Sequence, residues 1–302
     1  MSTIAWVGLG HMGGPMTAQL VAGGHEVRGF DLSAAAVSAA VAGGVIAVPG
    51  IPEALAGADV LITMLQRGSQ VRSVLDVALP LLSPGTLVLD CSTVAIDDAR
   101  DLHALVAGAG FGFLDAPVSG GVPGATAGTL TFMVGGAAAD LDRARPVLEP
   151  MAGRIFHIGP GGSGQAAKIV NNLMLGITLA ATCEGAVLAD RLGLDARVVH
   201  QLASVSSGDS WALRTWYPMP GVVETAAVNR DFEGGFAVDL MAKDLGLALA
   251  AGATTDTALP FTAAVADGLA RLQAAGLGDR DSSVFVKLVD GSVDRSVDGP
   301  AQ

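Results

Sequence analysis

The first half of the chain alternates short apolar runs with stretches of helical pattern. Short apolar or alternating runs at residues 4–8, 25–31, 60–65, 87–91, 112–115 and 130–134 predict buried strands. Helical patterns lie between them, for example at residues 15–22 and 34–42. Strands that alternate with helices predict an α/β fold, with a doubly wound, mostly parallel sheet and helices on both of its faces.

The pattern changes after a last candidate strand at residues 155–159. A glycine cluster at 159–164 precedes an almost uninterrupted helical pattern from 165 to 192, which would be roughly 40 Å long. Gly193 and Asp195 predict the end of this helix and a new cap, and the remainder is helical except for an irregular stretch at 206–235. We therefore expect an α/β domain at 1–162, an all-helical domain at 163–295 and a tail at 296–302.

Residues 8–13 form a glycine-rich turn between the first predicted strand and the first predicted helix. In a dinucleotide-binding fingerprint, the first glycine permits the tight turn, the second lets the backbone approach a pyrophosphate, and the third permits helix–strand contact. The chain has 41 glycines, so an ordinary glycine turn is the alternative, but the strand–turn–helix context favours the fingerprint. It predicts a Rossmann-type domain with a cofactor loop of Gly8, Leu9, Gly10, His11, Met12 and Gly13.

Asp31 ends the second predicted strand, 18 residues after Gly13. A carboxylate at this place accepts hydrogen bonds from the ribose hydroxyls of NAD and repels the 2′-phosphate of NADP. We therefore predict NAD as the cofactor. The alternative role of Asp31 is to cap the following helix, and the two roles are compatible.

The negative net charge limits the classes of binding partner that we expect. The net charge is −12, with 17 Lys and Arg against 29 Asp and Glu, so we expect neither nucleic acid nor an anionic membrane surface as a partner. Residues 169–188 are apolar, but Asn171, Asn172 and Glu184 interrupt them and favour a buried helix of a soluble protein. A helical domain rich in Ala and Leu predicts a homo-oligomer, either a dimer or a tetramer.

The cysteines and histidines give no sign of metal or nucleophilic chemistry. Cys91 and Cys183 stand alone, as buried thiols do in a reducing cytosol, and the chain begins without the basic region of a signal peptide. The five histidines are scattered and form no metal-ligand motif. We expect a cytoplasmic protein with no metal site.

Lys168 and Asn172 lie four residues apart, so they share one face of the long predicted helix. Lysine is rarely buried without a task, and burial lowers the pKa of a lysine in general, which makes it usable as an acid and base. By spacing alone, a catalytic lysine and a snorkelling surface lysine are equally good interpretations.

Four separate segments resemble one known family. They are residues 8–16 (GLGHMGGPM), 115–121 (DAPVSGG), 164–172 (GQAAKIVNN) and 243–245 (KDL). In order and spacing they are similar to the β-hydroxyacid dehydrogenases, and within that family to the 3-hydroxyisobutyrate dehydrogenases, over nearly the whole chain. This resemblance is far more specific than the glycine fingerprint alone.

The resemblance implies roles for matching residues. Lys168 would be the general acid and base, Asn172 would orient the substrate, and Asp244 would position Lys243. A hydroxyl and glycine amides suit the binding of a substrate carboxylate. The implied substrate contacts are Ser119, Gly120, Gly121, Asn172, Trp211 and Lys243. The further implied cofactor contacts are Met64, Leu65, Gln66, Thr93 and Lys243.

Two departures from the family pattern stand out. Gln66 replaces a usual proline, which adds backbone freedom to a cofactor loop, and Ser210 replaces a frequent cysteine before Trp211. The implied reaction is the NAD-dependent oxidation of 3-hydroxyisobutyrate to methylmalonate semialdehyde in valine catabolism. The alternatives are another short 3-hydroxy acid or semialdehyde (tartronate semialdehyde, 3-hydroxypropionate), an imine reductase, or a non-catalytic NAD-binding protein.

Overall fold

The computed structural model describes residues 1–293 and contains two compact units, Met1–Lys168 and Ile169–Gln302. The division falls inside the long helix α8 (Ser163–Arg191), which begins one residue after the expected boundary at 162. The tail expected at 296–302 lies outside the described residues.

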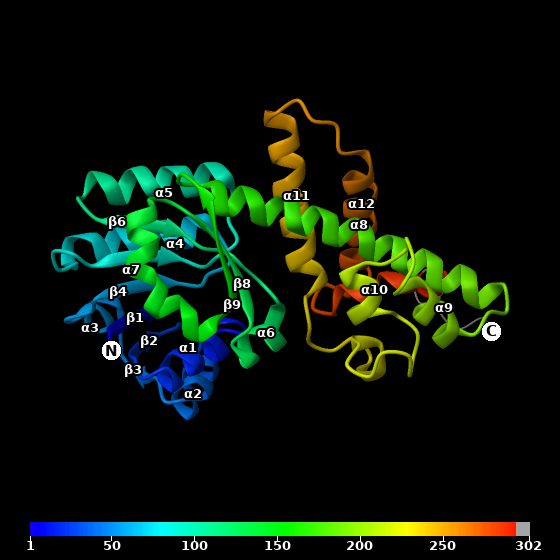
Figure 1. Ribbon diagram of the computed structural model, residues 1–302, viewed down its shortest axis with the longest axis horizontal. Helices are drawn as coiled ribbons and strands as arrows, with labels where there is room; N and C mark the ends of the chain where they lie inside the picture. The colour runs from blue at the N-terminus through cyan, green and yellow to red at the C-terminus, as the bar shows by residue number, and fades with distance from the viewer. Residues whose placement is uncertain (294–302) are drawn as a thin grey trace. The chain divides into compact units, whose positions relative to one another are not determined.

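Unit 1 contains a mostly parallel sheet (Figure 1). Its nine strands within residues 1–293 are β1 (Thr3–Val7), β2 (Glu26–Phe30), β3 (Ile46–Ala47), β4 (Val60–Thr63), β5 (Leu87–Asp90), β6 (Gly112–Asp115), β7 (Val118–Ser119), β8 (Leu130–Gly135) and β9 (Ala152–Gly159). The order is β3-β2-β1-β4-β5-β6-β8-β7, and β9 also pairs with β8. Strands β3, β2, β1, β4, β5 and β6 are parallel, whereas β8 runs antiparallel to β6 and β7. The predicted α/β fold is confirmed.

The side chains of a strand point alternately to the two faces of the sheet, and each face has its own hydrophobic core. Ile4 and Trp6 belong to the core under helices α1, α2, α6 and α7, and Ala5 and Val7 to the core under α3, α4 and α5. The helices of unit 1 are α1 (Gly13–Ala22), α2 (Ala34–Ala42), α3 (Ile51–Leu55), α4 (Gly68–Ala78), α5 (Ile96–Gly108), α6 (Gly121–Ala127) and α7 (Ala138–Leu148), with 3-10 turns η1 (Leu79–Leu81) and η2 (Glu149–Met151). This three-layer arrangement leaves the carboxyl ends of the parallel strands free to carry loops.

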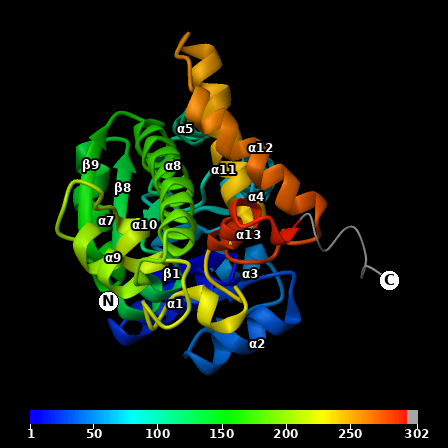
Figure 2. The ribbon, with the colours of Figure 1, turned by 90° about the vertical axis from the view of Figure 1, so that its right-hand side faces the viewer.

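The described part of unit 2 contains helices joined by turns and loops, and no strand. Beyond α8 it contains α9 (Ala196–Ala203), α10 (Trp211–Trp216), α11 (Val238–Thr254), α12 (Pro260–Ala274) and α13 (Val286–Val289), with 3-10 turns η3 (Ala227–Arg230) and η4 (Ser282–Phe285). Helices α11 and α12 lie side by side (Figure 2). Their core packs Met241, Leu245 and Leu269 against Leu179 and Cys183 of α8. The irregular stretch expected at 206–235 contains the short helix α10, which the sequence pattern missed.

Helix α8 is long and apolar enough to cross a membrane by length and composition. Its most apolar 18-residue window has a mean hydropathy of 1.5, and 44% of that window is buried inside the protein. A core helix of a soluble protein has the same properties. The buried polar residues Gln165, Lys168, Asn172 and Thr182 lie along the same helix, and such residues face a protein interior.

Candidate active site

The glycine-rich turn joins β1 to α1 and fits a dinucleotide. A Cβ atom on Gly8 would lie 2.3 Å from the Met64 carbonyl oxygen, and one on Gly13 would lie 1.9 Å from the Gly8 carbonyl oxygen. A Cβ atom on Gly10 would meet nothing within 4 Å. Gly8 and Gly13 are therefore required for close packing, while the backbone at Gly10 is open to a ligand. The first turn of α1 has no side-chain cap, so its N–H groups suit a pyrophosphate.

Asp31 lies directly after β2 and forms a hydrogen bond with the same glycine-rich turn. Its Oδ2 accepts a hydrogen bond from the Leu9 N–H at 2.7 Å, and its Oδ1 accepts one from the Ser33 N–H at 2.7 Å. Ser33 itself caps α2, by accepting a hydrogen bond from the Ala36 N–H. Asp31 therefore supports the loop that would hold the cofactor, in addition to its predicted contact with the ribose.

Replacing Asp31 by serine should weaken NAD binding and reduce discrimination against NADP. We expect the KM for NAD to rise about tenfold, because a hydrogen bond to a charged group contributes roughly 1.5 kcal/mol. The ratio of kcat/KM for NAD to that for NADP should fall. The matched control is Asp59→Ser, because Asp59 accepts the Thr3 N–H at the other end of β1, at 2.8 Å. An unchanged cofactor ratio in Asp31→Ser would contradict the assignment.

A buried hydrogen-bond network joins the loops that follow β4 and β5. Oδ1 of Asp90 accepts hydrogen bonds from the Thr63 hydroxyl at 2.8 Å and from the Ser92 hydroxyl at 2.5 Å. The Ser92 hydroxyl oxygen in turn accepts the Leu65 N–H at 2.8 Å. Burial raises the pKa of the Asp90 carboxyl above its usual value, although the hydroxyl donors oppose this. The network fixes the loops that carry the predicted cofactor contacts Met64, Leu65, Gln66 and Thr93.

The loop predicted to hold the substrate carboxylate follows β7. Ser119 ends this strand and pairs with Thr131 of β8. Gly120 and Gly121 have φ values of 134° and 61°, which side chains disfavour, and both are exposed. An exposed glycine pair next to a serine has no side chains to block an approaching anion, which is compatible with the predicted carboxylate site.

Asp115 fastens the first turn of α8 to the sheet. The side chain is 0% exposed, and its oxygens accept hydrogen bonds from the backbone N–H groups of Gly162 and Gln165, both at 2.9 Å. His103 lies 2.8 Å from the same carboxylate. The helix approaches closely, because a Cβ atom on Gly164 would lie 2.4 Å from the Met133 carbonyl oxygen. These contacts fix the first turn of α8, which directly precedes Lys168 along the chain.

Lys168 lies on α8 one turn after this anchored start. The residue is only 8% exposed, and this burial favours the catalytic interpretation over that of a surface lysine. A lysine in this position can exchange a proton with a bound hydroxyl group. Its role in catalysis stays a prediction.

In unit 2, Asp244 contacts two of the residues that are predicted to bind the substrate. Its Oδ2 accepts a hydrogen bond from the Asn172 Nδ2 at 2.5 Å, and its Oδ1 lies 3.2 Å from the Lys243 Nζ. The Oδ1 atom of Asn172 accepts a hydrogen bond from the Asn171 Nδ2 at 3.1 Å. Asp244 is 3% exposed, so α8 and α11 are joined through a buried carboxylate. The expected contact between Asp244 and Lys243 is present.

Trp211 begins α10 and is 46% exposed. It packs edge to face on Trp216, with ring centroids 5.0 Å apart, and Trp216 stacks on Phe236. The Ser210 hydroxyl caps the helix by accepting the Leu213 N–H at 3.0 Å. A cysteine in its place would lose most of this cap, so the departure at Ser210 has a structural consequence.

The structure thus brings together, within unit 1, the glycine-rich turn, the loops after β4 and β5, and the start of α8 with Lys168. Sequence analysis missed Asp90, Ser92, His103, Asp115 and Gln165, which connect them. Asp115 and Gln165 lie inside the segments that carried the family resemblance, and that was the only available signal.

The described residues, 1–293, offer little support for metal-dependent or cysteine-based catalysis. No group of three or more His, Cys, Asp or Glu side chains there could hold a metal ion. Both cysteines are buried and free, as expected, and burial raises the pKa of both thiols, so neither is an activated nucleophile.

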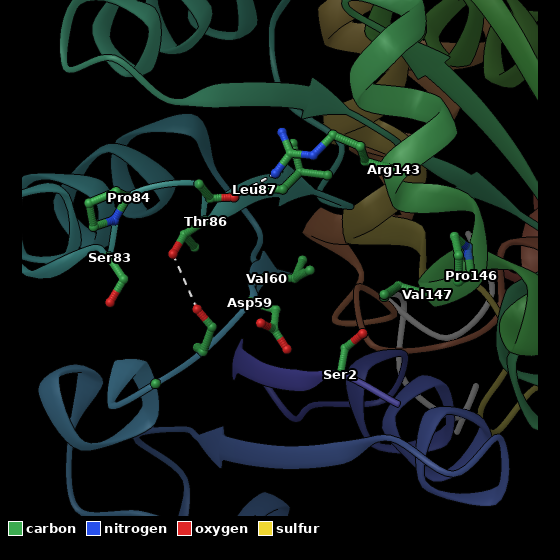
Figure 3. A pocket seen from close by; sticks show the side chains of 13 residues that line it. Ser2, Asp59, Val60, Ser83, Pro84, Thr86, Leu87, Arg143, Pro146 and Val147 are labelled. Atoms are coloured by element: carbon green, nitrogen blue, oxygen red, sulfur yellow. Dashed lines mark hydrogen bonds between the residues drawn. The ribbon is translucent and has the colours of Figure 1, made fainter.

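A cavity of ≈ 350 Å³ lies at the amino ends of β4 and β5, opposite the glycine-rich turn (Figure 3). Three of its polar side chains already have hydrogen-bond partners. Asp59 accepts the Thr3 N–H, Thr86 donates to the Ala58 carbonyl oxygen, and Arg143 donates to the Gly85 carbonyl oxygen. Ligands of doubly wound sheets bind at the carboxyl ends of the strands, so we assign this cavity no part in the reaction.

Known proteins that are similar to this chain include NAD-binding dehydrogenases, in agreement with the dinucleotide site described above. Residues 3–159 match the family described as the NAD-binding domain of 6-phosphogluconate dehydrogenase, and residues 162–289 match the family described as NAD-binding of NADP-dependent 3-hydroxyisobutyrate dehydrogenase. The chain is 48% identical to a probable 3-hydroxyisobutyrate dehydrogenase of Mycobacterium tuberculosis, over 97% of this chain and 100% of that protein.

Two further relatives extend the comparison. An NAD-dependent L-serine dehydrogenase of Pseudomonas aeruginosa is 45% identical, over 96% of this chain and 98% of that protein. The solved structure of a 3-hydroxyisobutyrate dehydrogenase of Mycobacterium tuberculosis with L-serine has a TM-score of 0.89 and 49% identity, over 96% of this chain and 99% of that one. The chain therefore belongs to the β-hydroxyacid dehydrogenase family, as an NAD-dependent oxidoreductase of the 3-hydroxyisobutyrate dehydrogenase type.

Proposed function

We propose that this enzyme oxidises 3-hydroxyisobutyrate to methylmalonate semialdehyde with NAD, as a step of valine catabolism. The observation that carries the proposal is the buried Lys168, one turn beyond a helix start that Asp115 fastens to the sheet. The 48% identity to a probable 3-hydroxyisobutyrate dehydrogenase, over the full length of that protein, supports the choice of substrate.

Lys168 is the proposed general acid and base. In the oxidation, the unprotonated Nζ of Lys168 accepts the proton of the substrate hydroxyl group as the carbon–oxygen double bond forms. The glycine-rich turn and Asp31 would hold NAD, which would supply the acceptor for the hydride of the carbinol carbon. In the reverse direction, the protonated Nζ returns the proton to the carbonyl oxygen.

The remaining site residues orient the substrate in this proposal. The Ser119 hydroxyl and the amides of Gly120 and Gly121 hold the carboxylate, which needs local donors because the net charge of −12 repels anions at long range. Asn172 and Lys243 stay predicted substrate contacts, and their link through Asp244 gives both a fixed orientation. Trp211 stays a predicted substrate contact.

L-Serine is the second candidate substrate. It has a hydroxyl group on the 3-carbon of a short acid, as 3-hydroxyisobutyrate does. One relative is named an L-serine dehydrogenase, and a similar 3-hydroxyisobutyrate dehydrogenase was solved with L-serine. Tartronate semialdehyde and 3-hydroxypropionate fit the same chemistry. An imine reductase or a non-catalytic NAD-binding protein would have less use for a buried lysine at this position of α8.

The test is a set of initial rates of NAD reduction with 3-hydroxyisobutyrate, L-serine, 3-hydroxypropionate and glycerate, repeated with NADP. We expect the highest kcat/KM with 3-hydroxyisobutyrate and NAD. A higher kcat/KM with L-serine would replace the substrate but keep the reaction class. Tight NAD binding with no turnover of any of the four acids would contradict the proposal as a whole.

We also propose that the enzyme is a cytoplasmic homodimer or homotetramer, with no nucleic acid or membrane partner. Helix α9 has no buried residue. Apolar side chains of 60–66% exposure lie on α8 (Leu188), directly after its end (Leu192) and on α9 (Val198 and Leu202). The double variant Val198→Glu/Leu202→Glu should lower the mass measured by light scattering to that of a monomer. Leu32→Glu, at an exposed position of unit 1, is the control. A monomeric wild type would contradict the proposal.

A further inference from the structure

The side chain of Gln165 is buried at the start of α8 and uses both ends of its amide. It is 0% exposed. Its Oε1 accepts a hydrogen bond from the Val94 N–H at 3.1 Å, and its Nε2 donates to the Ser92 carbonyl oxygen at 2.7 Å. The amide therefore spans the loop after β5 on both sides of Thr93, a predicted cofactor contact.

Ser92 connects this contact to the loop after β4. Its hydroxyl accepts the Leu65 N–H and donates to Asp90, while its carbonyl oxygen receives the Gln165 amide. A continuous path of hydrogen bonds thus runs from Leu65 through Ser92 to Gln165. Every member belongs to unit 1, and Asp90 fixes the path to the end of β5.

Helix geometry extends the path to Lys168. Residues three apart are neighbours on a helix surface and are separated by about 4.5 Å along the axis. Gln165 holds the rotation and the axial position of α8 against the loop at 92–94, and Lys168 lies on the next turn. The backbone bonds from Asp115 to Gly162 and Gln165 hold the helix start to β6, but only the Gln165 side chain, among these contacts, connects it to a cofactor loop.

We propose that Gln165 is a positioning residue that sets Lys168 against the nicotinamide half of NAD, by tying α8 to the loops that contact the cofactor. This inference rests on the proposed role of Lys168 as acid and base. It does not depend on which 3-hydroxy acid is the substrate. Misplacement of a catalytic group by about 1 Å can reduce the rate on the order of 10²-fold. The two hydrogen bonds of the Gln165 side chain should therefore have a large effect on turnover.

The first test compares two variants with a matched control. Gln165→Leu removes both hydrogen bonds, and Gln165→Glu keeps an acceptor for Val94 but loses the donor to Ser92. The control Thr86→Val removes another buried hydrogen bond, from Thr86 to the Ala58 carbonyl oxygen, at the amino ends of β4 and β5. All three variants are assayed with the hydroxy acid that the wild type turns over fastest.

We expect kcat to fall on the order of 30- to 100-fold in Gln165→Leu and less in Gln165→Glu, with the Kd for NAD within threefold of wild type. The deuterium isotope effect on kcat should increase, because hydride transfer becomes slower relative to product release. Thr86→Val should lower Tm but leave kcat and the isotope effect unchanged. A kcat within twofold of wild type in both Gln165 variants would overturn the proposal, as would a loss of NAD binding equal to the loss of kcat.

A second readout needs no turnover. The chain has three lysines, Lys168, Lys243 and Lys287, and the rate at which an acylating reagent modifies each can be followed by mass spectrometry. NAD should slow the modification of Lys168 in the wild type, and this protection should be reduced at least threefold in both Gln165 variants. Lys287 is the internal reference. Equal protection in wild type and variants would refute the coupling, whereas absent turnover with intact coupling would refute only the proposed function.

Discussion

Lys168→Ala should reduce kcat about 10³-fold while the Kd for NAD stays within threefold of wild type. Positioned acid–base groups contribute on the order of 10²–10⁴ to the rate, and Lys168 is the buried lysine that follows the anchored start of α8. The glycine-rich turn and Asp31, which would hold the adenosine half, are untouched by the change. Stopped-flow turnover and titration of NAD by protein fluorescence measure the two quantities separately.

Lys287→Ala is the matched control for this prediction. Lys287 lies 3.7 Å from Asp231 and over the ring of Phe232, in unit 2, and has no predicted contact with cofactor or substrate. Its removal should leave kcat unchanged. If Lys168→Ala keeps more than a tenth of the wild-type kcat, proton transfer does not depend on Lys168 and the assignment is wrong.

Asp115→Ala should destabilise the enzyme more than any other single change considered for unit 1. The carboxylate is fully buried and accepts hydrogen bonds from Gly162 and Gln165, with His103 also in contact. An alanine leaves these donors without an acceptor, and each unsatisfied buried group costs about 1–3 kcal/mol. We expect the free energy of unfolding in urea to fall by about 3 kcal/mol or more.

Asp115→Asn and Asp97→Ala complete that experiment. Asparagine keeps one acceptor oxygen but places an NH₂ group against a backbone donor, so it should be intermediate in stability. Asp97 forms an exposed ion pair with Arg100, and its removal should leave the unfolding midpoint unchanged. Equal stability of Asp115→Ala and wild type would show that the start of α8 is held by other contacts.

The strands and layers of unit 1 could be predicted from local sequence because each residue's face follows from its position. Ile4 and Trp6 alternate with Ala5 and Val7 between the two cores, and this period of two is visible in the sequence. Strands β3 and β7 have two residues each, which is too short for a periodic signal. Helix α10 has six residues and was lost in the irregular stretch for the same reason.

The contacts that organise the site could not be predicted in the same way. Gln165 bonds to residues 71 and 73 positions away, and Asp115 bonds to backbone groups 47 and 50 positions away. No local pattern encodes such distances, because they arise only when α8 packs against the finished sheet. The pairing of Asn172 with Asp244, 72 positions apart, is likewise a product of tertiary packing.

The most direct test of the central claim measures NAD reduction by wild type and Lys168→Ala with 3-hydroxyisobutyrate, in parallel with L-serine. We expect the highest wild-type kcat/KM with 3-hydroxyisobutyrate and a loss of about 10³-fold in kcat for the variant, at nearly unchanged NAD affinity. Turnover of 3-hydroxyisobutyrate by Lys168→Ala at more than a tenth of the wild-type kcat would contradict the role of Lys168.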